Sequence, residues 1–150
     1  MIKRIINKFC CFLKTHKKRG VRLFRPTNCH ISKSSVIKIE KRFDFNLPWN
    51  IRNKCALGSL SISDNATCNI GDVRFYAGSS LAVDGVFSMK SGYVNNNSKI
   101  FCRNKIEIGN HVFIAPEVII RDSDQHQIID LSSGGARTYL RQSRLVTMFG

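Results

Sequence analysis

Aliphatic residues recur at every sixth position in the second half of the chain. Two series keep this spacing, two positions out of step with each other: Ile108, Ile114 and Ile120, and Ile100, Ile106, Val112 and Val118. A helical face repeats every three or four residues and a strand face every two, so a period of six indicates neither a single helix nor a single strand. It is typical of short strands joined by turns that point aliphatic side chains into one narrow interior. The pattern predicts an all-β fold, a parallel β-helix.

An earlier series has the same period but a different phase. It consists of Phe75, Leu81, Phe87 and Tyr93, and it runs one residue out of step with the series that begins at Ile100. We therefore expect an inserted residue or loop near residues 95–98. Gly71, Gly78, Gly85 and Gly92 are expected at positions that need a positive φ or a small residue.

The end of the repeat carries a recognisable motif. An Ile-Gly-Asn unit at 108–110 is followed two units later by an Asp-x-Asp-x-His segment, which comprises Asp122, Asp124 and His126. In these residues the chain resembles the hexapeptide-repeat acyltransferases, in particular the bacterial O-acetyltransferases that modify sugars and cell-surface glycans. The resemblance extends more weakly over residues 57–129, about half of the chain.

The resemblance implies a fold, a reaction and an assembly. The fold is a left-handed parallel β-helix, here of about four partial coils, which departs from the right-handed rule for parallel crossovers. The acyl donor is acetyl-CoA, and the acceptor is a sugar or a cell-surface polysaccharide such as capsule, O-antigen or exopolysaccharide. Relatives of this kind are homotrimers with sites between subunits.

His126 is the candidate general base. Acetyl transfer from a thioester to an alcohol requires removal of a hydroxyl proton, and a neutral imidazole can accept it and return it to the leaving thiolate. Asp124 and Asp122 lie two and four residues earlier, on the same face of an extended strand. A carboxylate there can orient the imidazole. By resemblance, His126 matches the catalytic histidine of the family.

Two further polar positions have two interpretations. Asn96 and Asn97 lie where the register shifts and could bind a sugar hydroxyl, but asparagine is also common at turns because it tolerates left-handed backbone.

His111 is expected to be exposed at a turn. The γ-type carbonic anhydrases also have this fold and hold zinc with three histidine ligands. The repeat region contains only His111 and His126, so we expect no metal.

The positive charge lies outside the repeat. Of the net charge of +14, residues 1–41 carry twelve Lys or Arg against Glu40 alone, whereas residues 42–130 carry nine charges of each sign. A neutral body argues against a nucleic-acid partner. Residues 2–14 have helical periodicity and predict a basic amphipathic helix, which either caps the β-helix or contacts an anionic membrane surface. Both interpretations stay open.

The six cysteines have no zinc-finger spacing. We interpret them as reduced residues of a cytoplasmic protein, which would be peripheral at the inner membrane face if residues 2–14 are an anchor. The charged N-terminus is unlike a secretory signal, and no apolar run approaches ~18 residues.

The six-residue period ends before residue 131. We therefore expect three parts: a basic helix and linker at 1–25, an incomplete β-helix domain at 26–130 and an irregular tail at 131–150. Residues 141–150 can be encoded by CGC CAA AGC CGA TTG GTA ACC ATG TTT GG, and reading two bases later gives PKPIGNHVW, nearly the unit at 108–112. The tail is expected to be the product of a shifted reading frame. The alternative function is accordingly an inactive remnant or a structural scaffold.

Overall fold

Parallel strands account for almost all of the regular structure. A computed structural model describes residues 20–24, 26–48, 56–123, 128–130, 135–137 and 143–144. Every regular element in these ranges is a β-strand, so the predicted all-β class is confirmed. No helix in them has the length and apolar character needed to cross a membrane. The helix predicted for residues 2–14 lies outside the described residues.

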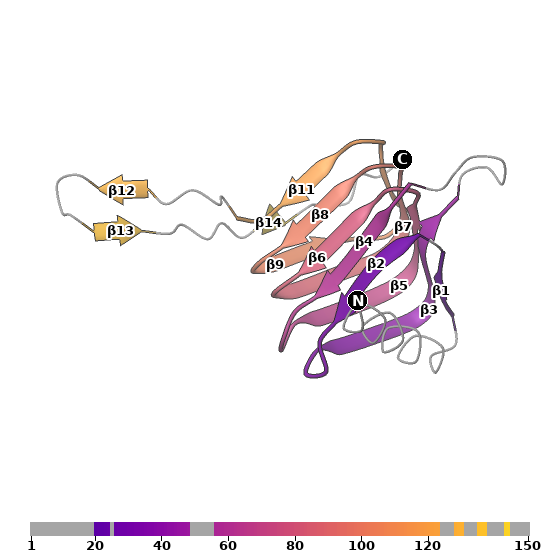
Figure 1. Cartoon of the computed structure of the whole chain (residues 1–150), viewed down its shortest axis with the longest axis horizontal. Coiled ribbons are helices and arrows are strands. Elements are labelled where there is room, and N and C mark those ends of the chain that lie inside the picture. The colour runs from indigo at the N-terminus through magenta and orange to yellow at the C-terminus, as the bar shows by residue number, and fades with distance from the viewer. Residues whose placement is uncertain are drawn as a thin grey trace.

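The strands form two large sheets (Figure 1). Among the described residues, the strand pairs within these two sheets are all parallel. The seven-stranded sheet contains β1 (Val21–Leu23), β3 (Val36–Leu47), β5 (Thr67–Tyr76), β7 (Val86–Val94), β9 (Lys105–Ile108) and β14 (Ser143–Arg144), with β10 (Val112–Ile114) paired to β7. The five-stranded sheet contains β2 (Thr27–Ile31), β4 (Gly58–Ile62), β6 (Ser80–Val83), β8 (Lys99–Cys102) and β11 (Ile119–Arg121).

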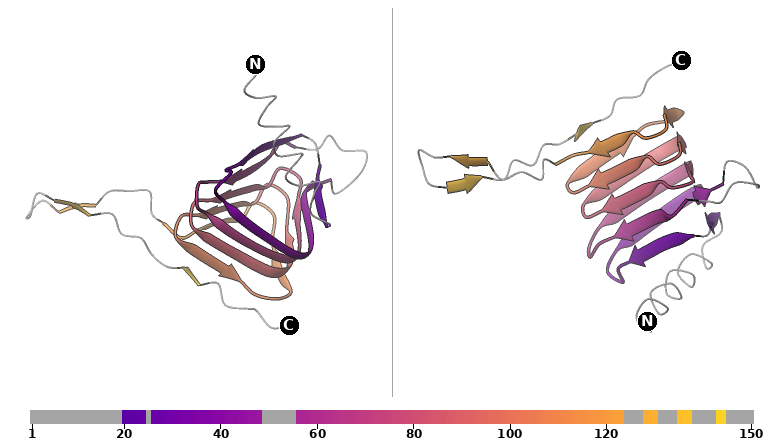
Figure 2. Two further views of the ribbon diagram at one scale, coloured as in Figure 1. Left: turned by 90° about the horizontal axis from the view of Figure 1, so that it is seen from below. Right: turned by 45° about the horizontal axis from the view of Figure 1, so that its top comes forward.

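The chain passes alternately through the two sheets and so winds into a coil. β2, β4, β6 and β8 of the five-stranded sheet are each followed by a strand of the seven-stranded sheet, and each of these four strands pairs with the strand of its own sheet one turn later. Leu60 pairs with Leu81, Leu81 with Ile100 and Ile100 with Ile120, so successive turns contain 21, 19 and 20 residues. Figure 2 shows these turns stacked around a common interior.

The tail at residues 131–150, predicted to be irregular, contains two short strands, at Gly135–Arg137 and Ser143–Arg144. The first of them belongs to a hairpin. β12 (Ile128–Asp130) pairs with β13 (Gly135–Arg137) in antiparallel orientation. β14 pairs in parallel with β9, with Ser143 opposite Ile106. The backbone of residues 143–144 therefore adds to the seven-stranded sheet at the position of the next turn.

The interior is built from the residues of the six-residue period. Ile100, Ile106, Ile108, Ile114 and Ile120 are buried. Val112 and Val118 are partly buried and pack against the same core. Two inward residues per strand, at positions i and i+2, follow from the alternation of side chains along a strand. Both aliphatic series therefore face the interior, as the pattern predicts.

The change of phase is at a different place from the one predicted. Tyr93 is only partly buried, whereas its neighbour Val94 is completely buried, so the extra residue falls between Phe87 and Val94 and the prediction of residues 95–98 is wrong. Gly92 lies within this interval, and its φ of 131° is in a region that other residues rarely adopt. A Cβ on Gly92 would lie 1.9 Å from the carbonyl oxygen of Val112. This conformation lets β7 bend and reset its alternation.

The cysteines are not all reduced thiols. Cys29 is disulfide-bonded, so the prediction of reduced cysteines is wrong at this position. Cys68 and Cys102 are free and buried. Burial raises the pKa of each of these two thiols to about 12. Neither provides a thiolate nucleophile near neutral pH, because the thiol is then protonated.

Candidate functional site

Asp122 is the member of the predicted catalytic set that the structure describes. It directly follows β11, and it is 1% exposed. One carboxylate oxygen accepts the backbone N–H of Arg103 at 2.8 Å. The other accepts the backbone N–H groups of Asn104 at 2.8 Å and Lys105 at 2.6 Å. Three successive N–H groups of one turn thus converge on a single carboxylate.

Earlier turns at the same corner satisfy the corresponding N–H groups differently. Asp84 N–H donates to the carbonyl of Cys102 at 2.8 Å, and Val86 N–H donates to the carbonyl of Asn104 at 2.9 Å. These acceptors are main-chain oxygens of the following turn of the coil. At residues 103–105 the Asp122 side chain takes over this role, because its carboxylate reaches the N–H groups from the next turn. Asp122 is therefore an anchor between the last two described turns of this corner.

The other predicted catalytic residues, Asp124 and His126, lie outside the described residues. Among the described residues, Asp122 is thus the part of the Asp-x-Asp-x-His motif that can be placed. Its hydrogen bonds attach the start of the motif to the corner formed by residues 103–105. The roles predicted for Asp124 and His126 stay predictions.

A second polar group at this corner was not found by sequence reasoning. The hydroxyls of Ser32 and Ser34 donate to the carboxylate of Asp64, and these hydrogen bonds lower the pKa of Asp64. One turn later, Ser63 Oγ donates to Asp84 Oδ1 at 2.5 Å. The signal in the sequence is a serine or aspartate just after four of the five strands of the five-stranded sheet: Ser32, Ser63, Asp84 and Asp122. These contacts connect neighbouring turns, which is a structural role.

Asn97 lies at a second corner of the coil and has left-handed backbone, with a φ of 59°. Asn46, Gly78 and Glu117 also have positive φ at this corner. The backbone N–H of Asn97 donates to Ala77 O at 3.0 Å, and Glu117 N–H donates to Asn96 O at 3.0 Å. The turn interpretation of Asn96 and Asn97 is therefore confirmed. In the described part of the chain, Asn96 Oδ1 is buried without a hydrogen-bond partner, and sugar binding by either asparagine stays a prediction.

His111 is exposed at the turn after β9, as predicted. Its φ is 54°, and its backbone N–H donates to Ser91 Oγ at 2.9 Å. Within the described ranges, no group of three His, Cys, Asp or Glu residues is arranged to hold a metal ion. The imidazole of His111 is thus a solvated side chain on a turn whose conformation is set by the backbone.

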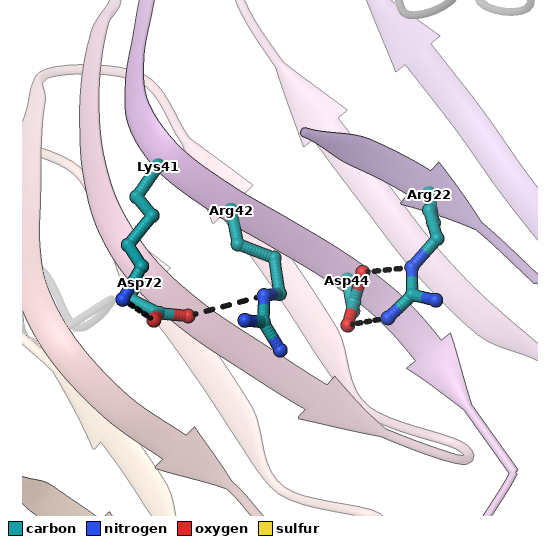
Figure 3. Close-up of polar contacts among 5 residues, drawn as sticks. All are labelled: Arg22, Lys41, Arg42, Asp44 and Asp72. Carbon is teal, nitrogen blue, oxygen red and sulfur yellow. Dashed lines mark hydrogen bonds and ion pairs between the residues drawn. The ribbon is translucent and has the colours of Figure 1, made fainter. Parts of the chain in front are cut away.

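Ion pairs connect the first strands on the outer surface of the seven-stranded sheet (Figure 3). Arg22 binds the buried carboxylate of Asp44 through two hydrogen bonds, of 2.7 and 2.6 Å, and thereby links β1 to β3. Lys41 Nζ and Arg42 Nε lie 2.9 and 3.4 Å from the Asp72 carboxylate, linking β3 to β5. The hydrogen bond from Lys41 and the nearby positive charges lower the pKa of Asp72.

Comparison of the chain with protein-family models, with curated proteins and with solved structures gives no match. The assignment of a function therefore depends on the repeat, the motif and the contacts described above.

Proposed function

We propose that this chain is an O-acetyltransferase of the hexapeptide-repeat type. It would transfer an acetyl group from acetyl-CoA to a hydroxyl of a sugar or cell-surface polysaccharide, and its coil would be left-handed, as in the family that the sequence resembles. The observation that carries the proposal concerns the start of the Asp-x-Asp-x-His motif. Asp122, its first residue, is buried against the main chain at the end of a coil whose interior consists of the hexapeptide aliphatic residues.

In the proposed reaction, His126 acts as the general base. Its neutral imidazole accepts the proton of the acceptor hydroxyl while the oxygen attacks the thioester carbonyl of acetyl-CoA. The C–S bond of the tetrahedral intermediate then breaks, and the imidazolium returns the proton to the CoA thiolate. Asp124 orients the ring and stabilises its positive charge. Asp122 contributes by anchoring the segment that carries both residues, because its own oxygens are bonded to backbone N–H groups.

The assembly and location belong to the same proposal. A homotrimer would place the acceptor and acetyl-CoA between subunits, as the resemblance implies. We place the protein in the cytoplasm, with residues 2–14 either capping the coil or contacting the inner face of the membrane. Bound metal is not required for this reaction, since an imidazole base and a thioester donor suffice.

The test compares two histidine variants. Radiolabelled acetyl-CoA is incubated with the purified chain and a panel of polysaccharides, and acetyl transfer is measured for the unmodified protein, His126→Ala and His111→Ala. His126→Ala should lower the rate by about 10²- to 10⁴-fold, the usual contribution of a general base. His111→Ala is the matched control, because His111 is an exposed histidine, and it should keep the rate. Equal rates in the two variants would exclude the assigned role of His126.

A non-catalytic scaffold is the second candidate function. The observation that favours it is the use of the Asp122 carboxylate, whose hydrogen bonds to three N–H groups serve the coil itself. For a scaffold, the unmodified chain should transfer no acetyl group to any member of the panel, while circular dichroism shows a folded β protein. Measurable transfer that depends on His126 would exclude the scaffold.

A further inference from the structure

Three aromatic side chains form a column on the outer surface of the coil. Tyr76, Tyr93 and Phe113 belong to β5, β7 and β10, on three successive turns. The rings of Tyr93 and Phe113 are stacked with centroids 4.7 Å apart, and Tyr76 meets Tyr93 edge-on at 5.8 Å. Phe113 is 63% exposed, more than any other large hydrophobic residue that the structure describes as exposed. We call these three residues the aromatic column.

The coil does not need exposed aromatic residues at outward positions in order to fold. Opposite Leu60, Ile62, Leu81 and Val83, which face the interior, the outward positions of β4 and β6 are occupied by small side chains: Ser59, Ser61, Ser80 and Ala82. Exposing a phenylalanine ring loses the free energy that its burial would provide. An aromatic column whose outermost ring, Phe113, stays exposed to water therefore indicates contact with a ligand or partner.

A guanidinium lies beside the aromatic column. Arg74 is the β-sheet neighbour of Tyr93 on one side and of Asp44 on the other. Asp44 is bound bidentately by Arg22, and Asp72 is paired with Lys41 and Arg42. In the part of the chain that the structure describes, the Arg74 guanidinium lies within ion-pair distance of no carboxylate, although its positive charge helps to lower the pKa of Asp72. Among these six charged residues the four positive charges outnumber the negative ones by two, and Arg74 is available to an anionic ligand.

We propose that the aromatic column and Arg74 bind an acidic oligosaccharide. A guanidinium matches the planar carboxylate of an acidic sugar with two parallel hydrogen bonds. The C–H groups of a sugar ring can contact the open face of Phe113, since the face of an aromatic ring is electronegative. The hydroxyl of Tyr93 can hydrogen-bond a sugar hydroxyl.

The arrangement of the rings favours a saccharide over single-stranded nucleic acid. Nucleic acid requires a free aromatic face for each stacked base. In the aromatic column one face of Tyr93 is covered by Phe113, and its ring also meets Tyr76. The outer face of Phe113 is the platform that stays open. One open face with an adjacent guanidinium fits one sugar ring and a carboxylate on a neighbouring sugar.

The register sets the length of the ligand. Arg74 and Phe113 are two strand spacings apart, since each is a sheet neighbour of Tyr93 on opposite sides. At ~4.8 Å per spacing this separation is ~10 Å. A ligand that reaches both groups is longer than one monosaccharide. The inference rests on the proposed function in naming this saccharide as the acceptor, but the binding itself is measured without acetyl-CoA.

Binding is tested with oligogalacturonate, a carboxylated probe, and with its methyl ester, which has the same sugar chain without the charge. Isothermal titration calorimetry of the full chain should show that the acid binds and that the ester binds at least about tenfold more weakly, because the ester lacks the charge-assisted hydrogen bonds. Raising the salt concentration should weaken binding of the acid. Equal affinities for acid and ester, or no binding of either, would overturn the proposal.

Matched variants locate the site. Phe113→Ala and Arg74→Gln should each weaken binding of the acid about tenfold or more. The controls are Ile119→Ala and Lys99→Gln, which change exposed residues of the five-stranded sheet, and these should leave binding unchanged. Circular dichroism verifies that all four variants are folded. If the controls weaken binding equally, or if an oligothymidylate of equal charge binds more tightly than the acid, the proposed site is wrong.

The two proposals can fail separately. If the acid binds at this site but no acetyl transfer is found, the inference stands and the acetyltransferase proposal fails. If Phe113→Ala and Arg74→Gln bind the acid as tightly as the unmodified chain and transfer acetyl groups at the unmodified rate, the inference fails while the acetyltransferase proposal stands.

Discussion

The carboxylate of Asp122 accepts the backbone N–H of Lys105 at 2.6 Å, across the boundary between two turns of the coil. Asp122→Ala should leave this N–H and those of Arg103 and Asn104 without an acceptor in a buried corner. Each unsatisfied buried group costs about 1–3 kcal/mol, and partial relaxation makes the costs less than additive, so we expect a loss of about 2–4 kcal/mol in unfolding free energy.

Chemical denaturation followed by circular dichroism measures the effect of Asp122→Ala. Asp84→Asn is the matched control, because its amide oxygen can still accept the hydrogen bond from Ser63 Oγ, the side chain is half exposed, and the ion pair lost with Arg103 is long, at 3.9 Å. An exposed pair of this kind contributes little, about 0–1 kcal/mol. If both variants unfold at the same denaturant concentration, the anchoring role of Asp122 is wrong.

The ion pairs of Asp72 predict a dependence of stability on pH. The hydrogen bond from Lys41, together with the nearby positive charges, lowers the pKa of Asp72 in the folded state. A lowered pKa means that the folded state favours the ionised carboxylate, so the stabilisation is complete above the unfolded pKa of about 3.9 and is lost as the pH falls through the folded value. We expect the melting temperature to fall as the pH decreases below about 4.

Asp72→Asn isolates this contribution. The variant should be less stable than the unmodified protein at pH 7, and the difference should shrink in acid, where Asp72 is protonated in both the folded and unfolded states. Melting temperatures at a series of pH values provide the measurement. A difference that stays constant throughout acid titration would show that the charge of Asp72 does not contribute.

Gly92 is the residue at which β7 changes the phase of its side chains. In Gly92→Ala the new Cβ would lie 1.9 Å from Val112 O, at a φ of 131° that L-residues rarely adopt. Strain of this kind costs about 1–3 kcal/mol, and the contact with the backbone adds to it. Ser88→Ala, at an outward position of the same strand, should change the unfolding free energy by less than about 0.5 kcal/mol. Thermal denaturation of both variants decides, and a stable Gly92→Ala would contradict the explanation.

The two interpretations of residues 2–14 predict different effects of one substitution. Phe9→Glu places a charge among the apolar positions of the predicted helix. If the segment contacts a membrane, the variant should no longer sediment with anionic vesicles and should keep its melting temperature. If the segment caps the coil, the melting temperature should fall and vesicle binding should be absent in both proteins. Lys8→Gln is a control for charge alone.

The sequence by itself determined the interior of the coil. Ile100, Ile106 and Ile108 could be assigned inward because a strand places alternate residues on one face and each turn contains nearly the same number of residues. This periodicity is local in the sequence, so it can be recognised without knowing which strands pair. The same reasoning predicted the exposure of His111, since its place within the six-residue unit defined it as a turn residue.

The six-residue count along the sequence led to a wrong prediction where β7 changes which of its side chains face the interior. Tyr93 and Val94 are adjacent, and both are suited to a core position, so the six-residue count selected Tyr93 while the structure buries Val94. The change of phase falls in the interval that contains Gly92, and whether a glycine bends a strand depends on the backbone that it meets in the next turn.

Only the tertiary structure decided which residues from different turns meet. Asp122 reaches the N–H groups of residues 103–105, and Phe113 stacks on Tyr93, because turn lengths of 19 to 21 residues set the register between neighbouring strands. A change of one residue in a turn would pair different side chains and turn each to the opposite face. The contacts from which the anchor and the proposed sugar site are inferred depend on that register, which the hydrophobic pattern alone does not specify.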